Sequence, residues 1–273
     1  MAGATLGKTK MINLQAAGPM EQFEILPIVP LSLGGIDISL TNSALWMLIC
    51  TGAIILFFFM ATRRASLIPG RVQSAAEVLY EFVADLVRDT IGSEGRKFFP
   101  YVFTLFIFIL AANLLGLIPS LPGIAHELHT FTTTSHLIVT LALAMVTISI
   151  VVVYGLMKNG LKFFKLFAPS GLPIYMYPLI VPIEIISFLS RPISLAVRLF
   201  ANMFAGHIIL KLFAGFVVSL IGVGGFISVL GIAPFLGAVA VTMLEFLVAA
   251  LQAYVFAVLT CIYLSDAAHA ADH

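Results

Sequence analysis

Long apolar runs alternate with short polar connections along this chain. Five such runs cover residues 41–62, 98–118, 136–157, 174–218 and 228–264. A helix of about 20 apolar residues crosses the hydrocarbon core of a bilayer, and each run is long enough to do so. The pattern therefore predicts an all-α integral membrane protein with five membrane-embedded helices, preceded by a tail over residues 1–40.

Residues 70–91 follow a different pattern. Acidic residues recur every four positions, at Glu77, Glu81, Asp85 and Asp89, while apolar residues occupy the other positions of a helical repeat. This spacing is typical of an amphipathic helix. We expect that helix to lie on the membrane surface, although the pattern fits a soluble docking helix equally well.

The last two apolar runs are longer than a simple crossing requires. As a single helix, the run at 174–218 would be on the order of 65 Å long, whereas a perpendicular crossing needs about 30 Å. We therefore expect both helices to be strongly tilted or broken at proline. The prolines concerned are Pro178, Pro182, Pro192 and Pro234.

Composition supports a membrane protein and the charges suggest its orientation. Hydrophobic residues make up 61% of the chain and charged residues 10%, and the net charge of +1 gives no indication of nucleic-acid binding. Basic residues gather between the first two crossings and after the third, at Arg63, Arg64, Arg71, Arg88, Arg96, Lys97, Lys158, Lys162 and Lys165. By the positive-inside rule these connections are cytoplasmic. The N-terminus is then outside and the C-terminus inside.

Polar residues interrupt the last two apolar runs at helical spacing. Glu184, Ser187, Arg191, Ser194 and Arg198 share one face of a helix, which Asn202 extends. His207 follows, and the returning run carries Glu245, Gln252 and Tyr263. The order along both helices predicts an outer group, His207 with Glu245, and an inner group, Glu184 with Ser187. Arg198 lies between them, which suggests two half-paths separated by a fixed positive charge.

Several of these residues have simpler explanations. Arg198 could form a structural ion pair with Glu184 or Glu245, and Arg191 could pair with Glu184. Tyr263 fits an anchor at the membrane interface, and Ser194 fits a hydrogen bond to its own helix. The chain as a whole could also be a secondary transporter, another proton-conducting membrane protein or, with Ser194 and His207, an intramembrane hydrolase. No pair of related halves and no glycine-rich nucleophile turn supports the transporter or the hydrolase.

Three segments resemble subunit a of F-type ATP synthases. They are RLFANMFAGH at 198–207, LEFLVAALQAYVFAVLT at 244–260 and NLLGLIP at 113–119. The resemblance extends over nearly the whole chain beyond Phe23. It implies a non-catalytic stator subunit that couples proton flow to ATP synthesis, in contact with a rotating ring of c subunits, peripheral-stalk b subunits, other subunits of the complex and membrane lipids.

The resemblance also implies roles for individual residues. Arg198 faces the ring; His207 and Glu245 belong to the outer half-channel, with Asn202 and Gln252 near the ring. Glu184, Ser187 and Tyr263 belong to the inner half-channel. Some bacterial members have Glu and His exchanged at the positions of His207 and Glu245, but either order supplies one acid and one imidazole.

The remaining expectations concern the ion, the ligands and the location. The His207–Glu245 pair favours protons over sodium. The sequence contains no P-loop, and we expect no cofactor and no metal site. Because the first residues lack a basic, transit-like leader, a bacterial inner membrane is favoured over the mitochondrial inner membrane.

Overall fold

A computed structural model gives the fold of this chain. It describes residues 27–29, 32–33, 36–37, 39–63, 65–118, 134, 136–167, 174–225 and 227–269. Within them, five apolar helices are long enough to cross a membrane, and one further long helix is amphipathic. The all-α fold class predicted from the sequence is confirmed.

The first part of the described chain contains short strands and one apolar helix. The strands are β1 (Pro27–Val29), β2 (Ser32–Leu33), β3 (Ile36–Asp37) and β4 (Leu40–Thr41). They form two antiparallel pairs, β1 with β4 and β2 with β3, in a region that the sequence analysis treated as a tail. Helix α2 (Asn42–Thr62) follows, and the hydroxyl oxygen of Thr41 caps it by accepting a hydrogen bond from the amide of Ala44.

The amphipathic helix α3 (Arg71–Ile91) is followed by a short 3-10 helix, η2 (Gly92–Lys97). It ends at Gly92, where the backbone φ of +77° suits glycine. Val83, Val87 and Ile91 are buried on one side of α3, which packs against α4 (Phe99–Gly116) and the last long helix, α8 (Ile232–Ala268). The amphipathic pattern therefore corresponds to a helix attached to the bundle along one face.

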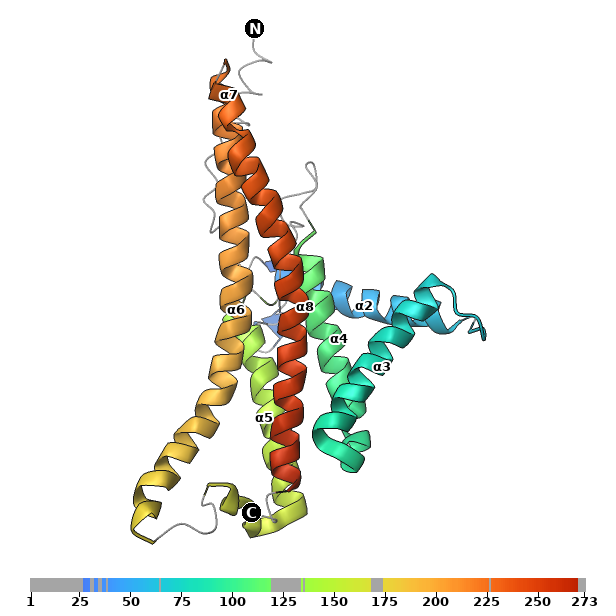
Figure 1. The fold of residues 1–273 in the computed structure, drawn as a ribbon, viewed down its shortest axis with the longest axis vertical. Helices are drawn as coiled ribbons and strands as arrows, with labels where there is room; N and C mark the ends of the chain where they lie inside the picture. Colours follow the sequence, from blue (N-terminus) through green and yellow to red (C-terminus); the bar gives the residue numbers. More distant parts are fainter. Residues whose placement is uncertain are drawn as a thin grey trace.

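The other helices are α5 (Leu137–Asn159), α6 (Tyr177–Val223), α7 (Ile227–Leu230) and α8 (Ile232–Ala268), with 3-10 turns η5 (Gly160–Phe167) and η6 (Ile174–Met176) between α5 and α6. Helix α6 continues through Pro182 and Pro192 without a break but curves away from α8 at its first turns (Figure 1). Pro234 lies in the first turn of α8, where proline is tolerated. The sequence predicted that this helix would be either strongly tilted or broken at proline. The described α6 is one unbroken helix that curves.

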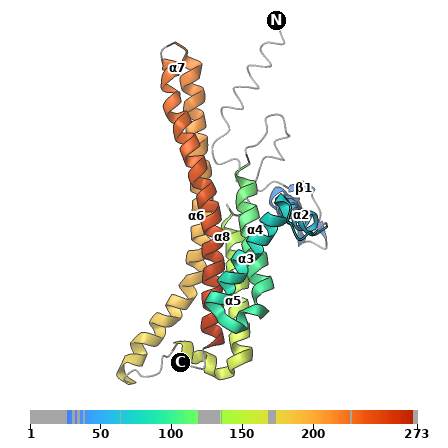
Figure 2. The ribbon, with the colours of Figure 1, turned by 45° about the vertical axis from the view of Figure 1, so that its right-hand side comes forward.

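Helix α8 is the centre of the bundle. It packs against α3, α4, α5 and α6, and it supplies many of the buried core side chains, among them Phe256 and Leu264. Figures 1 and 2 show α6 beside α8, and α2 on the opposite side of α4 from α6. Helix α2 runs across the other helices (Figure 1). One side of α6 is thus left uncovered by the described chain.

Candidate functional site

The polar residues predicted from the sequence come from α6 and α8, which run side by side in opposite directions (Figure 2). Two groups form where the helices meet, and both are named here by their central residue. The Glu245 cluster consists of Gly206, His207 and Glu245. The Arg191 cluster consists of Glu184, Arg191, Tyr263 and Asp266.

The Glu245 cluster depends on a glycine. A Cβ atom at Gly206 would lie 1.9 Å from Oε1 of Glu245, so a larger residue there would displace the carboxylate. Glu245 is only 6% exposed, and its Oε2 atom accepts no hydrogen bond from the described residues. His207 follows Gly206 and is half-buried. The cluster therefore places a buried carboxylate, with an acceptor atom that the described residues leave unused, against the helix turn that carries His207.

An amide pair links the two helices one turn from Arg198. The Nδ2 atom of Asn202 donates a hydrogen bond to Oε1 of Gln252 at 3.3 Å. Gln252 is buried, and its Nε2 group has no acceptor among the described residues. The pair places Gln252 beside α6 one helical turn beyond Arg198.

Arg198 lies on the exposed side of α6, next to the exposed apolar side chain of Val197. Within the described ranges it forms no ion pair. The structural pairing with Glu184 or Glu245, which the sequence left open, is therefore not formed there. Arg198 stays charged at any relevant pH. Arg198 is thus a guanidinium on the exposed side of an apolar helix, without an ion pair among the described residues.

The Arg191 cluster is held by charge pairs. The guanidinium of Arg191 lies 3.6 Å from Oε1 of Glu184 and 3.7 Å from Oδ2 of Asp266. Its central carbon also lies 5.3 Å from the ring centre of Tyr263, a cation–π contact. The local partnership of Glu184 and Arg191 that the sequence offered is thus present, and Tyr263 is buried beneath Arg191. Ser187 is half-buried one turn from both Glu184 and Arg191.

Sequence reasoning did not single out Gly206, Asp266 or Asn113 as site residues. The buried Asn113 donates a hydrogen bond to the carbonyl oxygen of Ala249 at 3.3 Å and accepts one from the hydroxyl of Thr134 at 2.8 Å. Ala249 lies one turn beyond Glu245 on α8. The signal for Asn113 was a lone amide inside an apolar run. The signal for Asp266 was a carboxylate three residues after Tyr263, at the end of the last run.

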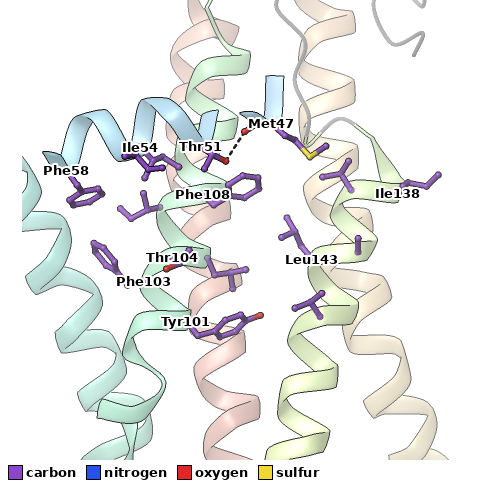
Figure 3. A pocket seen from close by; sticks show the side chains of 16 residues that line it. Met47, Thr51, Ile54, Phe58, Tyr101, Phe103, Thr104, Phe108, Ile138 and Leu143 are labelled. Carbon is purple, nitrogen blue, oxygen red and sulfur yellow. Dashed lines mark hydrogen bonds between the residues drawn. The ribbon is translucent and has the colours of Figure 1, made fainter. Parts of the chain in front are cut away.

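A cavity of about 800 Å³ lies apart from these residues, between α2, α4 and α5 (Figure 3). Its walls are mostly apolar, and the polar groups on them already have partners. Thr51 donates to the carbonyl of Met47 and Thr104 to that of Pro100, while the hydroxyl of Tyr101 pairs with that of Thr147 at 2.8 Å. No predicted site residue lines this cavity. It is not a path between the two clusters.

Comparison with known proteins assigns the chain to a family. The family model described as ATP synthase A chain matches residues 44–265. The chain is 57% identical over 258 residues to ATP synthase subunit a of Hyphomonas neptunium, covering 94% of this chain and 98% of that protein. It is 57% identical to subunit a of Mesorhizobium japonicum, with 92% and 96% covered, and 58% identical to that of Maricaulis maris, with 92% and 97% covered.

Proposed function

The chain belongs to the ATP synthase A chain family, and from this premise we propose that it passes protons to and from a rotating c-subunit ring through two offset half-channels. As a member of this family it is a non-catalytic, multi-pass membrane subunit that serves proton transport for ATP synthesis. The route of the protons and the role of each residue are the proposal. They rest on the exposed, unpaired Arg198 between the two clusters.

Arg198 is the barrier between the half-channels. Placing a guanidinium at membrane depth costs at least about 2.5–3.5 kcal/mol on insertion scales, and the described chain offers Arg198 no counter-ion. A carboxylate on a c subunit that turns past the uncovered side of α6 would supply one. Because a nearby cation favours the ionised carboxylate, Arg198 would help the ring site release its proton and would repel a proton moving directly between half-channels.

The Glu245 cluster takes up protons from outside. Its carboxylate and the His207 imidazole are both side chains that serve as general acids and bases in proton transfer. The free hydrogen-bonding capacity of Glu245 Oε2 leaves room for water or the imidazole to deliver a proton. Asn202 and Gln252 then carry the path from Glu245 toward the ring, one turn from Arg198.

The Arg191 cluster, with Ser187, releases protons to the cytoplasm. Glu184 and Tyr263 both contact Arg191, and Ser187 adds a hydroxyl on the same helix. Along α6, Glu184 of the Arg191 cluster precedes Arg198, and Gly206 of the Glu245 cluster follows it. The two clusters therefore lie on opposite sides of Arg198. A proton can therefore pass from one cluster to the other only by riding on the ring.

The partners and the orientation follow from the same proposal. The c-subunit ring lies against α6, and peripheral-stalk b subunits, other ATP synthase subunits and lipids cover the rest. The N-terminus is outside and the C-terminus is cytoplasmic, as the basic connections suggest. The three relatives named above come from bacteria, which supports a bacterial inner membrane. Protons are the ion, because an acid with an imidazole suits proton relay.

The replacement Arg198→Ala tests the central residue. In inverted vesicles we expect ATP-driven acidification to be abolished while the complex still assembles. In complexes stripped of the catalytic head, passive proton leak should rise because the barrier is gone. Val197→Ala is the matched control, since it shortens the adjacent exposed side chain and should leave pumping near normal. Near-normal pumping by Arg198→Ala would mean that the arginine is structural, and the half-channel proposal would be abandoned.

A further inference from the structure

A second pocket combines two arginines with an apolar wall. It encloses about 420 Å³ between the end of α3, η2 and the start of α4. Arg88, Ser93 and Arg96 supply its polar lining, and Tyr80, Ala84 and Phe99 supply apolar surface. We propose that this pocket binds the phosphate of an anionic membrane phospholipid. The inference concerns a site apart from α6 and does not depend on the proton path.

The charges of the pocket favour a phosphate. Its two guanidinium groups provide up to ten N–H donors in a geometry suited to phosphate oxygens. Arg96 has no ion pair with any described residue. Arg88 pairs with Asp85, but both side chains are well exposed, and exposed pairs of this kind are weak. A phosphate can therefore share the donors of Arg88.

The nearest acid in η2 is engaged elsewhere. Glu94 accepts hydrogen bonds from Lys158 Nζ at 2.6 Å and from Tyr154 Oη at 2.9 Å. These contacts draw its carboxylate toward α5. Among the described residues, Arg88 and Arg96 are the only charged side chains that line the pocket.

The position of the pocket favours a lipid over a soluble phosphate. Helix α3 is amphipathic but keeps Val78, Tyr80 and Phe82 exposed, which is typical of a helix at a membrane surface. Arg96 and Lys97 directly precede α4, one of the five candidate spans. Basic pockets at this boundary are suited to anionic headgroups.

Apolar space continues from the pocket in the direction of the spans. Tyr80 is also a wall of a neighbouring cavity of about 280 Å³ between α2 and α3. That cavity in turn shares Phe58 and Phe103 with the cavity of about 800 Å³ shown in Figure 3. The cavity of about 280 Å³ also has two acidic lining residues, Glu77 and Glu81, and both are exposed. An acyl chain would therefore lie along the aromatic rings that the cavities share, those of Tyr80, Phe58 and Phe103. Internally bonded polar groups in the last cavity suit a hydrocarbon chain.

Lipid titration of the full chain tests the proposal. The delipidated chain in neutral detergent is titrated with phosphatidylglycerol or phosphatidylcholine of identical acyl chains, and bound lipid is counted by native mass spectrometry. Each arginine near an anionic headgroup contributes about 1 kcal/mol. We therefore expect the unaltered chain to bind phosphatidylglycerol about 30-fold more tightly than phosphatidylcholine. The double variant Arg88→Gln, Arg96→Gln should lose that preference. The double variant Arg63→Gln, Arg71→Gln removes the same charge from exposed positions outside the pocket and should keep it.

Each other outcome overturns the assignment. Equal loss in both double variants would mean diffuse attraction rather than a site, and retention in the Arg88, Arg96 variant would place the lipid elsewhere. If inorganic phosphate at micromolar concentration displaces phosphatidylglycerol, the site binds free phosphate. If the intact ATP synthase complex binds no phosphatidylglycerol that depends on Arg88 and Arg96, a partner subunit covers the pocket.

Discussion

The Glu245 cluster and the Arg191 cluster lie on the same two helices, but their polar groups differ in how many partners they have within the chain. Arg191 has two carboxylate partners at 3.6 and 3.7 Å and stacks on an aromatic ring. Glu245 is buried against a glycine, and one of its oxygens has no hydrogen-bond donor among the described residues. The charged groups of one cluster have partners within the cluster, whereas the other contains a carboxylate oxygen that no described residue uses as an acceptor.

The difference suggests which of the two proposed half-channels depends more on exact side-chain placement. Burying an acid without full hydrogen bonding is unfavourable, so such a group is expected where it has a task. An ion-paired cluster near the end of a helix tolerates change more readily, since each partner can be replaced by another or by water. We therefore expect changes in the Glu245 cluster to have larger effects than changes in the Arg191 cluster.

Glu245→Gln should give the largest effect of the cluster variants. The amide keeps the shape of the carboxylate but cannot exchange a proton, and a positioned acid–base group contributes about 10²–10⁴-fold to proton transfer. We expect passive proton flux through head-stripped complexes to fall at least about 100-fold, with no added leak. Thr242→Val, which removes a hydroxyl bonded only to its own helix, is the control. An uncoupled leak in Glu245→Gln would remove Glu245 from the uptake path.

Gly206→Ala should come next. The added methyl group would meet Oε1 of Glu245 at 1.9 Å, so the carboxylate must move although its chemistry is unchanged. Overpacking of this kind typically costs about 1–3 kcal/mol, and we expect about a tenfold loss of proton flux. Gly215→Ala on the same helix is the matched control, because nothing lies within 4 Å of its added Cβ. Equal effects of the two alanines would mean that helix propensity, not Glu245, is responsible.

Asp266→Asn should have a small effect, because Arg191 has a second carboxylate partner in Glu184. Arg191 loses one charged partner but keeps Glu184 and the ring of Tyr263. Partly exposed ion pairs contribute about 0.2–1 kcal/mol, so ATP-driven pumping should fall about twofold at most. The measurement is the initial rate of vesicle acidification. A loss as large as that of Glu245→Gln would break the contrast between the two clusters.

The sequence predicted the helices well because each apolar run must satisfy its backbone groups internally within a membrane. The five spans followed from that requirement and from the length of each apolar run, and the amphipathic helix followed from its helical periodicity. The periodicity of Glu184, Ser187, Arg191 and Arg198 likewise placed them along one helix. What periodicity could not give was the register between α6 and α8, because side-chain spacing within a helix says nothing about which residue of its neighbour it meets.

The missed residues illustrate this limit. Gly206 has no chemistry of its own, and its importance comes only from the Glu245 carboxylate that lies against it. Asp266 lies 75 residues from Arg191 in sequence, so its pairing depended on how the two long helices pack. Tyr263 was expected to serve as an interface anchor or in the inner half-channel, and its burial beneath Arg191 became visible only with that register.

Glu94 lies outside the candidate spans and, like Arg191, has an ion-pair partner and an aromatic contact. Its partners are Lys158 and Tyr154. The hydrogen bond from Lys158, followed by that from Tyr154, lowers the pKa of Glu94 below its ordinary value of 4.5. A lowered pKa in the folded state means that the contribution to stability is present above pH 4.5 and is lost as the pH falls through the folded pKa.

Glu94→Gln should therefore lower the melting temperature slightly at pH 7, and the difference from the unaltered chain should shrink as the pH falls to about 3.5. Thermal unfolding of the full chain in detergent measures this directly. Glu81→Gln, at an exposed position of α3 without an ion pair among the described residues, is the control and should not reproduce the change. A difference that grows toward low pH would have the wrong sign, and the link between η2 and α5 would then not depend on an ionised Glu94.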